Sequence, residues 1–302
     1  MGRVLQPFSY FEPETLNEAG DLISAPNAHL VAGGCQLVRA IRLGRHQPAR
    51  LVNLSRIQGL DDLTNDENGN LIIGASATLS QIEESGLVRE NWHALEDVFQ
   101  RVIPQQVRNA GTLAGNIAAA VPYYDFPVAL TALGVKICCE KLGTQREIPM
   151  KDFYVAPRRT QVEPGEIIIS LVLPSVSTGE GSNLKSILKA RRHQQDVQKI
   201  NASVWIKLNE TSRVVEDARI VVGGCDYHPL RLNGAEDFIR GLTPDENTII
   251  QLGECAADQI EPLTDHPWIE PVRKSFVQAL VHDAATSAHE RAVQSIHMQS
   301  SI

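Results

Sequence analysis

Residues 28–44, AHLVAGGCQLVRAIRLG, constrain the fold of this chain more than any other stretch. A short apolar run breaks on Gly33-Gly34, and apolar residues then resume at the spacing of one helical face. The stretch therefore predicts a buried strand, a tight glycine turn and a helix. An amphipathic segment at 14–24 precedes it and an apolar run at 49–55 follows it, so we expect a compact strand–helix–strand unit near the N-terminus.

Inside the predicted helix, the spacing places Leu37, Val38 and Ile41 on one side. Arg39 and Arg42 fall on other sides. The helix closes on a glycine, a favoured residue at a helix C-terminus. The spacing therefore predicts a helix whose apolar residues share one side.

The pattern of predicted strands, helices and turns changes twice along the rest of the chain, which predicts two further units. The Gly/Ser-rich stretch at 177–183 is the expected linker between them. Beyond it, strand-like runs followed by helical segments favour an antiparallel sheet covered on one face. The predicted class is α+β, with domains at 1–56, 57–176 and 177–302. The expected elements are a helix across 89–102, strands at 135–140, 165–174, 184–190, 202–208 and 214–224, and helices at 232–240, 244–260 and 268–290.

Composition excludes several classes of function. With 28 basic against 36 acidic residues the net charge is −8, and the short run at 189–193 is the one basic cluster noted, so we expect no nucleic-acid partner. No apolar segment approaches the roughly 20 residues of a membrane helix, and the N-terminus has no signal-like core, so we expect a cytoplasmic location. The five cysteines show neither CxxC nor Cys/His spacing, so no metal site is expected.

The Gly33-Gly34 turn has two readings. Glycines between a strand and a helix let the backbone approach a ligand, and the free N–H groups of the helix start suit a pyrophosphate. A plain strand-to-helix turn explains the same residues equally well. The dinucleotide pattern GxGxxG and the P-loop pattern GxxxxGK[ST] are both absent, so no motif supports a nicotinamide or NTPase site.

A second small-residue loop, RNAGTLAGN at 108–116, favours the ligand-binding reading. It offers glycines for backbone access together with Thr112 and Asn116, and Asp125 follows shortly after. Polar groups among glycines are hard to explain as core, because buried polar groups need partners. Two such loops about 80 residues apart could grip a long ligand from two subdomains.

Four stretches, in this order and spacing, resemble the FAD-binding medium subunit of molybdenum hydroxylases, the family of xanthine dehydrogenase, carbon monoxide dehydrogenase and aldehyde oxidoreductase. They are VAGGCQLV, VRNAGTLAGNIAAAVPYYDFP, GEIIISLVLP and KARRHQQDVQKINASVWI. The resemblance covers nearly the whole chain. It implies a vanillyl-alcohol-oxidase-type FAD-binding domain of two subdomains, followed by a C-terminal domain of antiparallel sheet and helices.

The resemblance also implies roles for individual residues. The first loop would wrap the FAD pyrophosphate and the second would hold phosphate and ribityl groups. Two apolar residues would pack on the flavin, and one carboxylate would hold a polar part of the cofactor. The first loop consists of Ala32, Gly33, Gly34, Cys35, Gln36 and Leu37, and the second loop contributes Gly111, Thr112, Gly115 and Asn116. The two apolar residues are Val102 and Ile168, and the carboxylate is that of Asp125.

Three positions depart from the family pattern. Cys35 stands where the family often has Thr, Asn, His or Gln, which removes one side-chain donor to a phosphate. Ala114 replaces the first glycine of a Gly-Gly-Asn run, and Leu188 occupies the slot of a flavin-proximal lysine. The inserted four-cysteine loop that holds an extra iron–sulfur cluster in some members is absent, so no cluster is expected on this chain.

The implied function is electron transfer. Substrate oxidation would occur on a molybdenum cofactor in a large subunit, and electrons would pass through [2Fe-2S] clusters of a small subunit to FAD on this chain. An acceptor such as NAD, a quinone or oxygen would then take them. The flavin carries the redox chemistry, so no catalytic side chain is expected here. Two alternatives remain at this point: a stand-alone FAD oxidoreductase, and a flavin-free scaffold subunit of the same fold.

Overall fold

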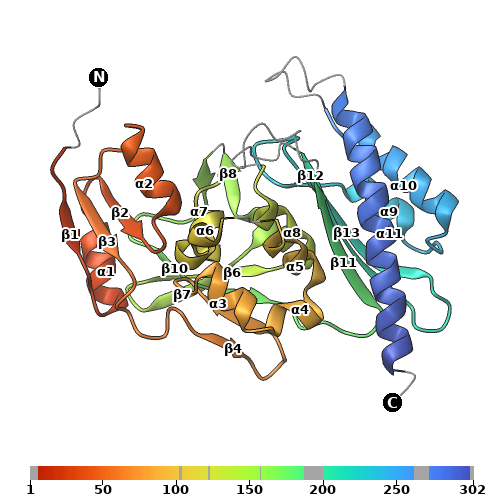
Figure 1. The fold of residues 1–302 in the computed structure, drawn as a ribbon, viewed down its shortest axis with the longest axis horizontal. Helices are drawn as coiled ribbons and strands as arrows, with labels where there is room; N and C mark the ends of the chain where they lie inside the picture. The colour runs from red at the N-terminus through yellow and green to blue at the C-terminus, as the bar shows by residue number, and fades with distance from the viewer. Residues whose placement is uncertain are drawn as a thin grey trace.

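The computed structural model describes residues 6–101, 104–121, 123–156, 158–186, 200–261 and 272–299. Three β-sheets lie in a row, with the N-terminal sheet at the left of Figure 1, a central sheet in the middle and a C-terminal sheet at the right. Helices fill the space between the central and C-terminal sheets and cover the right-hand end. Two glycine loops of the sequence fall at the boundary between the first two units.

The N-terminal unit is a parallel three-stranded sheet in the order β1-β3-β2. Parallel strands need a crossover, and α1 and α2 provide it. Thr15 caps α1, because its side chain accepts a hydrogen bond from the Glu18 N–H, and Ala19 packs on Val52 in a small apolar core. The elements are β1 (Ser9–Phe11), α1 (Leu16–Ile23), β2 (Ala28–Val31), α2 (Cys35–Arg42) and β3 (Arg50–Asn53).

The central unit is an antiparallel five-stranded sheet in the order β4-β5-β10-β6-β7. A group of short helices packs on it and encloses the largest apolar core of the described residues. The elements are β4 (Leu63–Asn65), β5 (Leu71–Gly74), α3 (Leu79–Glu84), α4 (Leu87–Asn91), α5 (His93–Phe99), α6 (Gln105–Ala110), α7 (Leu113–Ala118), α8 (Asp125–Leu133), β6 (Lys136–Lys141), β7 (Thr144–Pro149), η1 (Met150–Asp152), β8 (Tyr154–Ala156), β9 (Arg159–Thr160) and β10 (Ile167–Leu173).

The C-terminal unit is an antiparallel sheet in the order β11-β12-β13-β14. Its strands alternate: Val204 and Ile206 of β12 face the C-terminal core, whereas Trp205 between them joins the central core. The prediction that the helices following this sheet cover one of its faces is confirmed, and α5 and α8 of the central unit pack on the other face. The elements are β11 (Glu180–Ser186), β12 (Asn201–Leu208), β13 (Val215–Gly223), β14 (Leu230–Arg231), α9 (Asn233–Ile239), α10 (Glu246–Asp258) and α11 (Arg273–Gln299).

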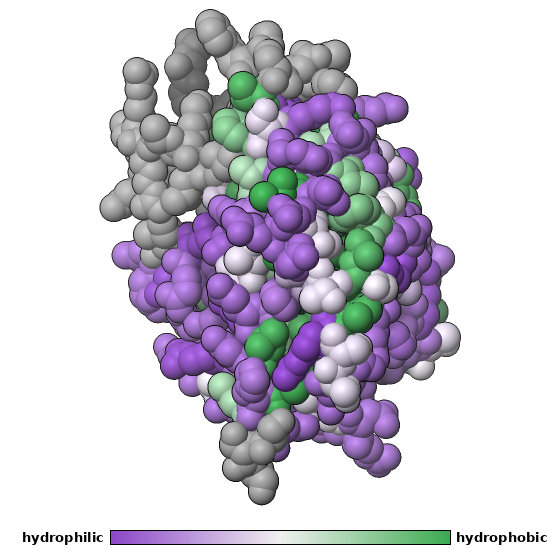
Figure 2. Space-filling view, turned by 90° about the vertical axis from the view of Figure 1, so that its right-hand side faces the viewer, coloured by the Kyte–Doolittle hydropathy of each residue, from purple (hydrophilic) through white to green (hydrophobic). Residues whose placement is uncertain are grey.

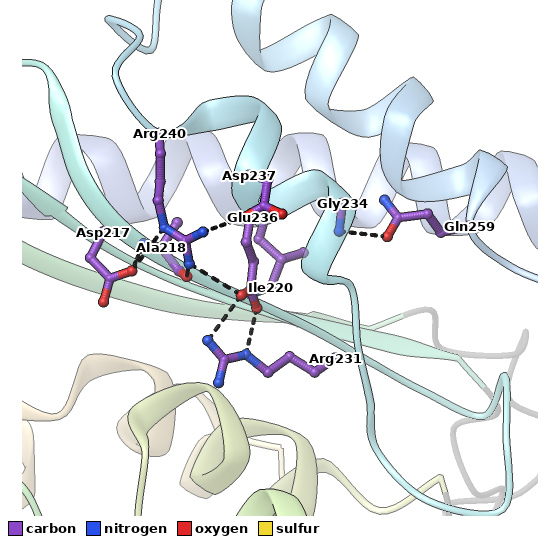
Figure 3. Close-up of polar contacts among 9 residues, drawn as sticks. All are labelled: Asp217, Ala218, Ile220, Arg231, Gly234, Glu236, Asp237, Arg240 and Gln259. Carbon is purple, nitrogen blue, oxygen red and sulfur yellow. Dashed lines mark hydrogen bonds and ion pairs between the residues drawn. The ribbon is translucent and has the colours of Figure 1, made fainter.

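A buried carboxylate fixes α9 on this sheet (Figure 3). Glu236, which is 1% exposed, accepts hydrogen bonds from the Arg231 guanidinium at 2.7 and 2.9 Å and from the Ile220 N–H at 3.0 Å. Arg240 adds an ion pair at 3.5 Å. Full pairing is what makes a buried charge tolerable. Figure 2 shows the outer face of this unit as mostly hydrophilic, and the large apolar side chains exposed on its helices α10 and α11 include Ile250 and Met298.

Two predicted elements differ from the structure. The single helix expected across 89–102 is broken at Trp92, whose φ of −108° and ψ of 63° are not helical. The buried Trp92 indole donates a hydrogen bond to the Pro174 carbonyl oxygen at 2.9 Å, and this contact holds the break. The expected linker at 177–183 is wrong from Glu180 onward, because β11 begins there.

The small residues that suggested a linker serve helix packing instead. A Cβ on Gly181 would overlap the Ala288 carbonyl oxygen and lie 2.5 Å from the Ala292 nitrogen of α11. Ser182 and Asn183 are buried beside it. Glycine is required here because the helix lies directly against the strand. The basic run at 189–193 and Leu188 lie outside the described residues.

Candidate functional site

The two glycine loops meet in the structure. Gly33 lies between β2 and α2, Ala110 is the last residue of α6, and Gly111 follows it before α7. A Cβ on Gly33 would overlap the Ala110 carbonyl oxygen and would lie 2.6 Å from the Ala110 carbon and 2.8 Å from the Gly111 Cα. Only glycine permits this backbone contact. The loops of the first and second units therefore form one continuous surface.

Gly34 has a different role from Gly33. It caps α2 with a φ of +67°, a left-handed conformation that side chains other than glycine rarely adopt. A Cβ at this position would meet the nearest atom, a Val38 methyl, at 3.4 Å, so space is available. No side chain caps α2 and its first turn has no acidic residue, so its N–H groups and positive dipole end are available to an anion.

Cys35, the first residue of α2, is exposed and contacts α6, the helix that leads into the second loop. Its Sγ donates a weak hydrogen bond to the Val107 carbonyl oxygen at 4.0 Å. Burial of the sulfur raises the pKa of the Cys35 thiol, although a backbone hydrogen bond lowers it. The thiol stays protonated at neutral pH and is therefore a loop contact, not a nucleophile.

The second loop is braced by its own hydrogen bonds. The Thr112 Oγ1 accepts a hydrogen bond from the Gly115 N–H at 3.0 Å and thereby caps α7, and the Leu79 N–H donates to the Gly111 carbonyl oxygen at 2.8 Å. Asn116 differs, because its Oδ1 is buried and has no hydrogen-bond partner among the described residues. A buried acceptor without a partner is costly, and a ligand donor would satisfy it.

A surface pocket of about 690 Å³ lies beside the first loop. Its walls are the loop itself and the outer face of α2. Within the described residues, no ion pair joins either of its two arginines to a carboxylate, so the pocket has positive character. The lining residues are Gly33, Gly34, Cys35, Val38, Arg39, Arg42 and Leu43.

Sequence reasoning missed Arg39 and Arg42 as part of this site and placed Val38 on a different side of the helix from them. Val38 is 49% exposed and lines the pocket beside both arginines. The spacing from Cys35 held the signal, because residues three, four and seven positions later lie on the same helical face. Counting apolar residues alone grouped Val38 with Leu37 and Ile41.

Asp125 begins α8 and is held by the C-terminal unit. The Asn201 Nδ2 of β12 donates a hydrogen bond to its Oδ1. Burial raises the pKa of Asp125 to about 6, while the hydrogen bond from Asn201 and the charge of Arg101 act in the opposite direction. The structure therefore links this predicted cofactor residue to the neighbouring domain.

The remaining predicted site residues lie at different places. Ile168 is 8% exposed and sits in the central core, where β10 pairs it with Cys139 of β6. Ala32, Gln36 and Leu37 are half-buried around the first loop. Val102 lies outside the described residues. The structure thus brings the first loop and Gly111 together, and places Ile168 and Asp125 on other elements.

Comparison with known proteins assigns the family. Residues 6–176 match the family described as FAD binding domain in molybdopterin dehydrogenase, and residues 185–288 match the CO dehydrogenase flavoprotein C-terminal domain. A two-part flavoprotein is thus the class that the fold and the paired loops define. The chain belongs to the FAD-binding family of the molybdopterin dehydrogenases.

Two medium chains and one solved structure match over most of their own length. The glyceraldehyde dehydrogenase medium chain of Sulfolobus acidocaldarius is 26% identical over 92% of this chain and 96% of its own. The carbon monoxide dehydrogenase medium chain of Hydrogenophaga pseudoflava is 25% identical over 85% and 88%. Among solved structures, carbon monoxide dehydrogenase from Hydrogenophaga pseudoflava shares the fold with a TM-score of 0.88, at 23% identity over 96% of this chain and 99% of that one.

These findings confirm the resemblance and the fold class, including a FAD-binding part and a C-terminal sheet-and-helix part. The chain is a FAD-binding medium subunit of the molybdenum hydroxylase type, with an electron-transfer role, and in CO dehydrogenase-type complexes the molybdenum and iron–sulfur cofactors belong to partner subunits. The individual FAD contacts and the domain boundaries at 56 and 176 stay predictions. No helix in the described part of the chain is long and apolar enough to span a bilayer.

Proposed function

We propose that this chain grips FAD between the loop at 32–37 and the loop at 111–116, within the domains predicted at 1–56 and 57–176. As the medium subunit of a cytoplasmic complex, it takes electrons from a small [2Fe-2S] subunit and passes them to an external acceptor such as NAD or a quinone. The large subunit holds the molybdenum cofactor and oxidises the substrate. The single observation that supports the site is the backbone contact of Gly33 with Ala110 and Gly111.

The chain's own residues fit this cofactor. Free N–H groups at the start of α2 suit the pyrophosphate, which needs no lysine there. The unpartnered Asn116 Oδ1 can accept a hydrogen bond from a hydroxyl of the ribityl chain. Thr112 supports this loop by capping α7, so its hydroxyl acts mainly through Gly115.

Three further residues have supporting roles in the proposal. Val102 and Ile168 provide apolar contacts to the flavin, and Asp125 accepts a hydrogen bond from a polar part of the cofactor. FAD, once bound, supplies the two-electron redox chemistry, so the protein has only to bind it, orient it and set its environment. The chain needs no general acid or base for this role.

The first experiment measures flavin content. The purified chain, and the apo chain refolded with FAD, should show flavin absorption, with about one FAD per chain by extraction. Gly34→Ala should lose most of it, because a left-handed alanine distorts the anion-binding turn. Gly86→Ala is the matched control: Gly86 also has a positive φ, +73°, with no atom of the described residues within 4 Å of its Cβ position, but it caps α4. An intact chain that binds no FAD would favour the scaffold alternative and overturn the proposal.

The second experiment identifies the acceptor. The FAD-loaded chain is photoreduced, mixed separately with NAD, a quinone and oxygen, and followed by recovery of flavin absorption. Co-purification of a large molybdenum-containing chain and a small iron–sulfur chain would support the subunit role. A flavin-loaded chain that oxidises a substrate unaided would instead establish the stand-alone oxidoreductase.

A further inference from the structure

The stretch from residue 22 to residue 60 carries no aspartate or glutamate, although the whole chain has a net charge of −8. It holds five arginines, namely Arg39, Arg42, Arg45, Arg50 and Arg56. The N-terminal unit is therefore locally cationic in an acidic protein. Such a charge distribution attracts anions to one face of the molecule.

The structure separates these arginines by their contacts. Arg56 pairs with Glu14 at 2.9 Å, and Arg50 lies over the Phe11 ring at 5.8 Å. The other three, Arg39, Arg42 and Arg45, are exposed and form no ion pair with any carboxylate that the structure describes. Arg39 and Arg42 line the 690 Å³ pocket together with Gly33 and Gly34, whereas Arg45 does not.

Arg39 also reaches toward the second unit. Burial raises the pKa of Tyr124, the residue before α8, and the positive charges of Arg39 and Arg158 oppose that rise. The Arg39 guanidinium is therefore close enough to influence a side chain across the boundary between the two units. A cation beside the first glycine loop, with no ion pair to any carboxylate in the described part of the chain, is placed to meet an anionic ligand.

We propose that Arg39 and Arg42 neutralise the pyrophosphate of the bound dinucleotide and so select FAD over flavins without phosphate. The inference rests on the proposed function, because it assigns a phosphate to the same pocket. The backbone N–H groups of α2 donate hydrogen bonds to the pyrophosphate but carry only a partial positive charge. The guanidiniums of Arg39 and Arg42, in the last turn of the same helix, add the full positive charges that balance the two phosphates. Val38 and Leu43, which are both 49% exposed and line the same pocket, would provide apolar contacts for the adenine ring.

A purely structural role is the competing explanation. Arg39 and Arg42 lie in the last turn of α2, where a cation also stabilises the helix dipole. In that case their removal would lower the stability of the apo chain and reduce its affinity for every ligand equally. Binding to a phosphate instead predicts an effect confined to phosphate-bearing ligands and reduced by salt.

The test is a titration of the apo chain with FAD, with riboflavin, which has no phosphate, and with ADP as a competitor. We expect Arg39→Gln to weaken FAD and ADP binding about tenfold, and Arg39→Gln with Arg42→Gln about a hundredfold, the size of lost hydrogen bonds between charged groups. Riboflavin affinity and the melting temperature of the apo chain should stay unchanged. Arg45→Gln, from the same cationic stretch but outside the pocket, should match the wild type for all three ligands.

Each failure has its own signature. If the wild-type apo chain binds no FAD, the proposed function itself fails. If the wild type binds FAD and the Arg39 and Arg42 variants bind it as tightly as Arg45→Gln does, the assignment of these two residues is wrong and the proposed function survives. Equal losses for FAD and riboflavin, or a lower melting temperature of the apo variants, would establish the structural role and also overturn the assignment. High salt should narrow the FAD difference between variant and wild type.

Discussion

At the scale of single residues, the variant Gly33→Ala tests whether flavin binding and stability depend on the contact between the two loops. Gly33→Ala forces a methyl group into the backbone of Ala110 and Gly111, neither of which can yield as a flexible side chain would. We expect a stability loss of about 1–3 kcal/mol, the usual cost of overpacking, together with loss of most bound flavin. Denaturant unfolding and extracted flavin content measure the two effects.

Gly20→Ala is the control for this variant. Gly20 lies in α1 of the same unit, and its nearest neighbour would be 3.9 Å from the new Cβ. Alanine in a helix should stabilise by about 0.5–1 kcal/mol and leave the flavin in place. Equal flavin content in Gly33→Ala and Gly20→Ala would show that the contact between the loops is not needed for binding.

Asp125 predicts a pH dependence of stability. Because burial raises the pKa of its carboxyl from 3.8 to about 6, the folded state binds more protons than the unfolded state between these values. The stabilising contribution of Asp125 is thus complete below about pH 4 and is lost as the pH rises through about 6. Asp125→Asn keeps an acceptor for the Asn201 amide but cannot ionise.

We therefore expect the free energy of unfolding of Asp125→Asn, relative to that of the wild type, to rise by on the order of 2 kcal/mol between pH 4 and pH 6.5. Above pH 6.5 this difference should change little. Thermal unfolding of the apo proteins across this range provides the measurement. Asp66→Asn is the control, because hydrogen bonds from Asn70 lower the pKa of Asp66. The stability of this variant relative to the wild type should therefore fall as the pH rises, the opposite of Asp125→Asn. A pH-independent difference between wild type and Asp125→Asn would refute the assignment.

At the scale of elements, the packing of α11 on β11 depends on Gly181. We expect Gly181→Val to destabilise the chain by about 2–3 kcal/mol, because the strand and the helix backbone would have to separate. Flavin content per folded chain should be unchanged, since the change is confined to the C-terminal unit. Urea unfolding with flavin extraction reports both quantities.

Gly143→Ala gives the comparison, because it adds a Cβ that meets no atom within 4 Å at a positive φ of +77°. Its cost should be the left-handed conformation alone, about 1 kcal/mol. If both variants lose the same stability, helix contact is not the reason for glycine at 181.

Periodicity predicted the regular elements well and failed where a distant contact decides the backbone. The strands at 135–140 and 202–208 and the helix at 244–260 follow from their apolar spacing, which is local information. The break at Trp92 depends on a hydrogen bond to Pro174, 82 positions away. The stretch around Gly181 resembled a linker because the feature that requires glycine there, the backbone of α11, lies more than 100 residues later in the sequence.

The candidate site was predictable to a similar extent. The glycines of both loops stand out in the sequence, and the resemblance joined them as one site. Their mutual contact, the different roles of Gly33 and Gly34, and the position of Arg39 and Arg42 on the pocket wall need three-dimensional neighbours. Asp125 appeared as a loop carboxylate, and its bond to Asn201 from another sheet could not be read from spacing.

At the scale of the whole molecule, the C-terminal sheet is the support for the flavin-binding part. Its outer face packs on α11, and its inner face packs on α5 and α8 of the central unit. The helix that begins with Asp125, a predicted cofactor contact, therefore rests on the sheet of the C-terminal unit. Such a construction favours unfolding of the two parts as one cooperative unit.

One ion pair connects these parts most directly. Asp97 of α5 accepts hydrogen bonds from the Arg291 guanidinium of α11 at 2.8 and 2.9 Å, and from the Asn183 amide and the Leu184 N–H of β11 at 2.7 and 3.1 Å. The two charged side chains are 18% and 26% exposed. A partly buried, bidentate and further hydrogen-bonded pair should be stronger than a typical surface pair.

A double-mutant cycle with Asp97→Asn and Arg291→Gln should therefore give a coupling energy of about 1–3 kcal/mol. The same cycle on Lys136 and Glu147, an ion pair at 2.8 Å whose side chains are 53% and 51% exposed, should give less than about 1 kcal/mol and vanish in high salt. Because Asp97 and Arg291 belong to different units, loss of their pair should also separate the unfolding of the C-terminal unit from that of the flavin-binding part. Equal coupling in the two cycles, with a single sharp transition in every variant, would mean that apolar packing alone joins the units.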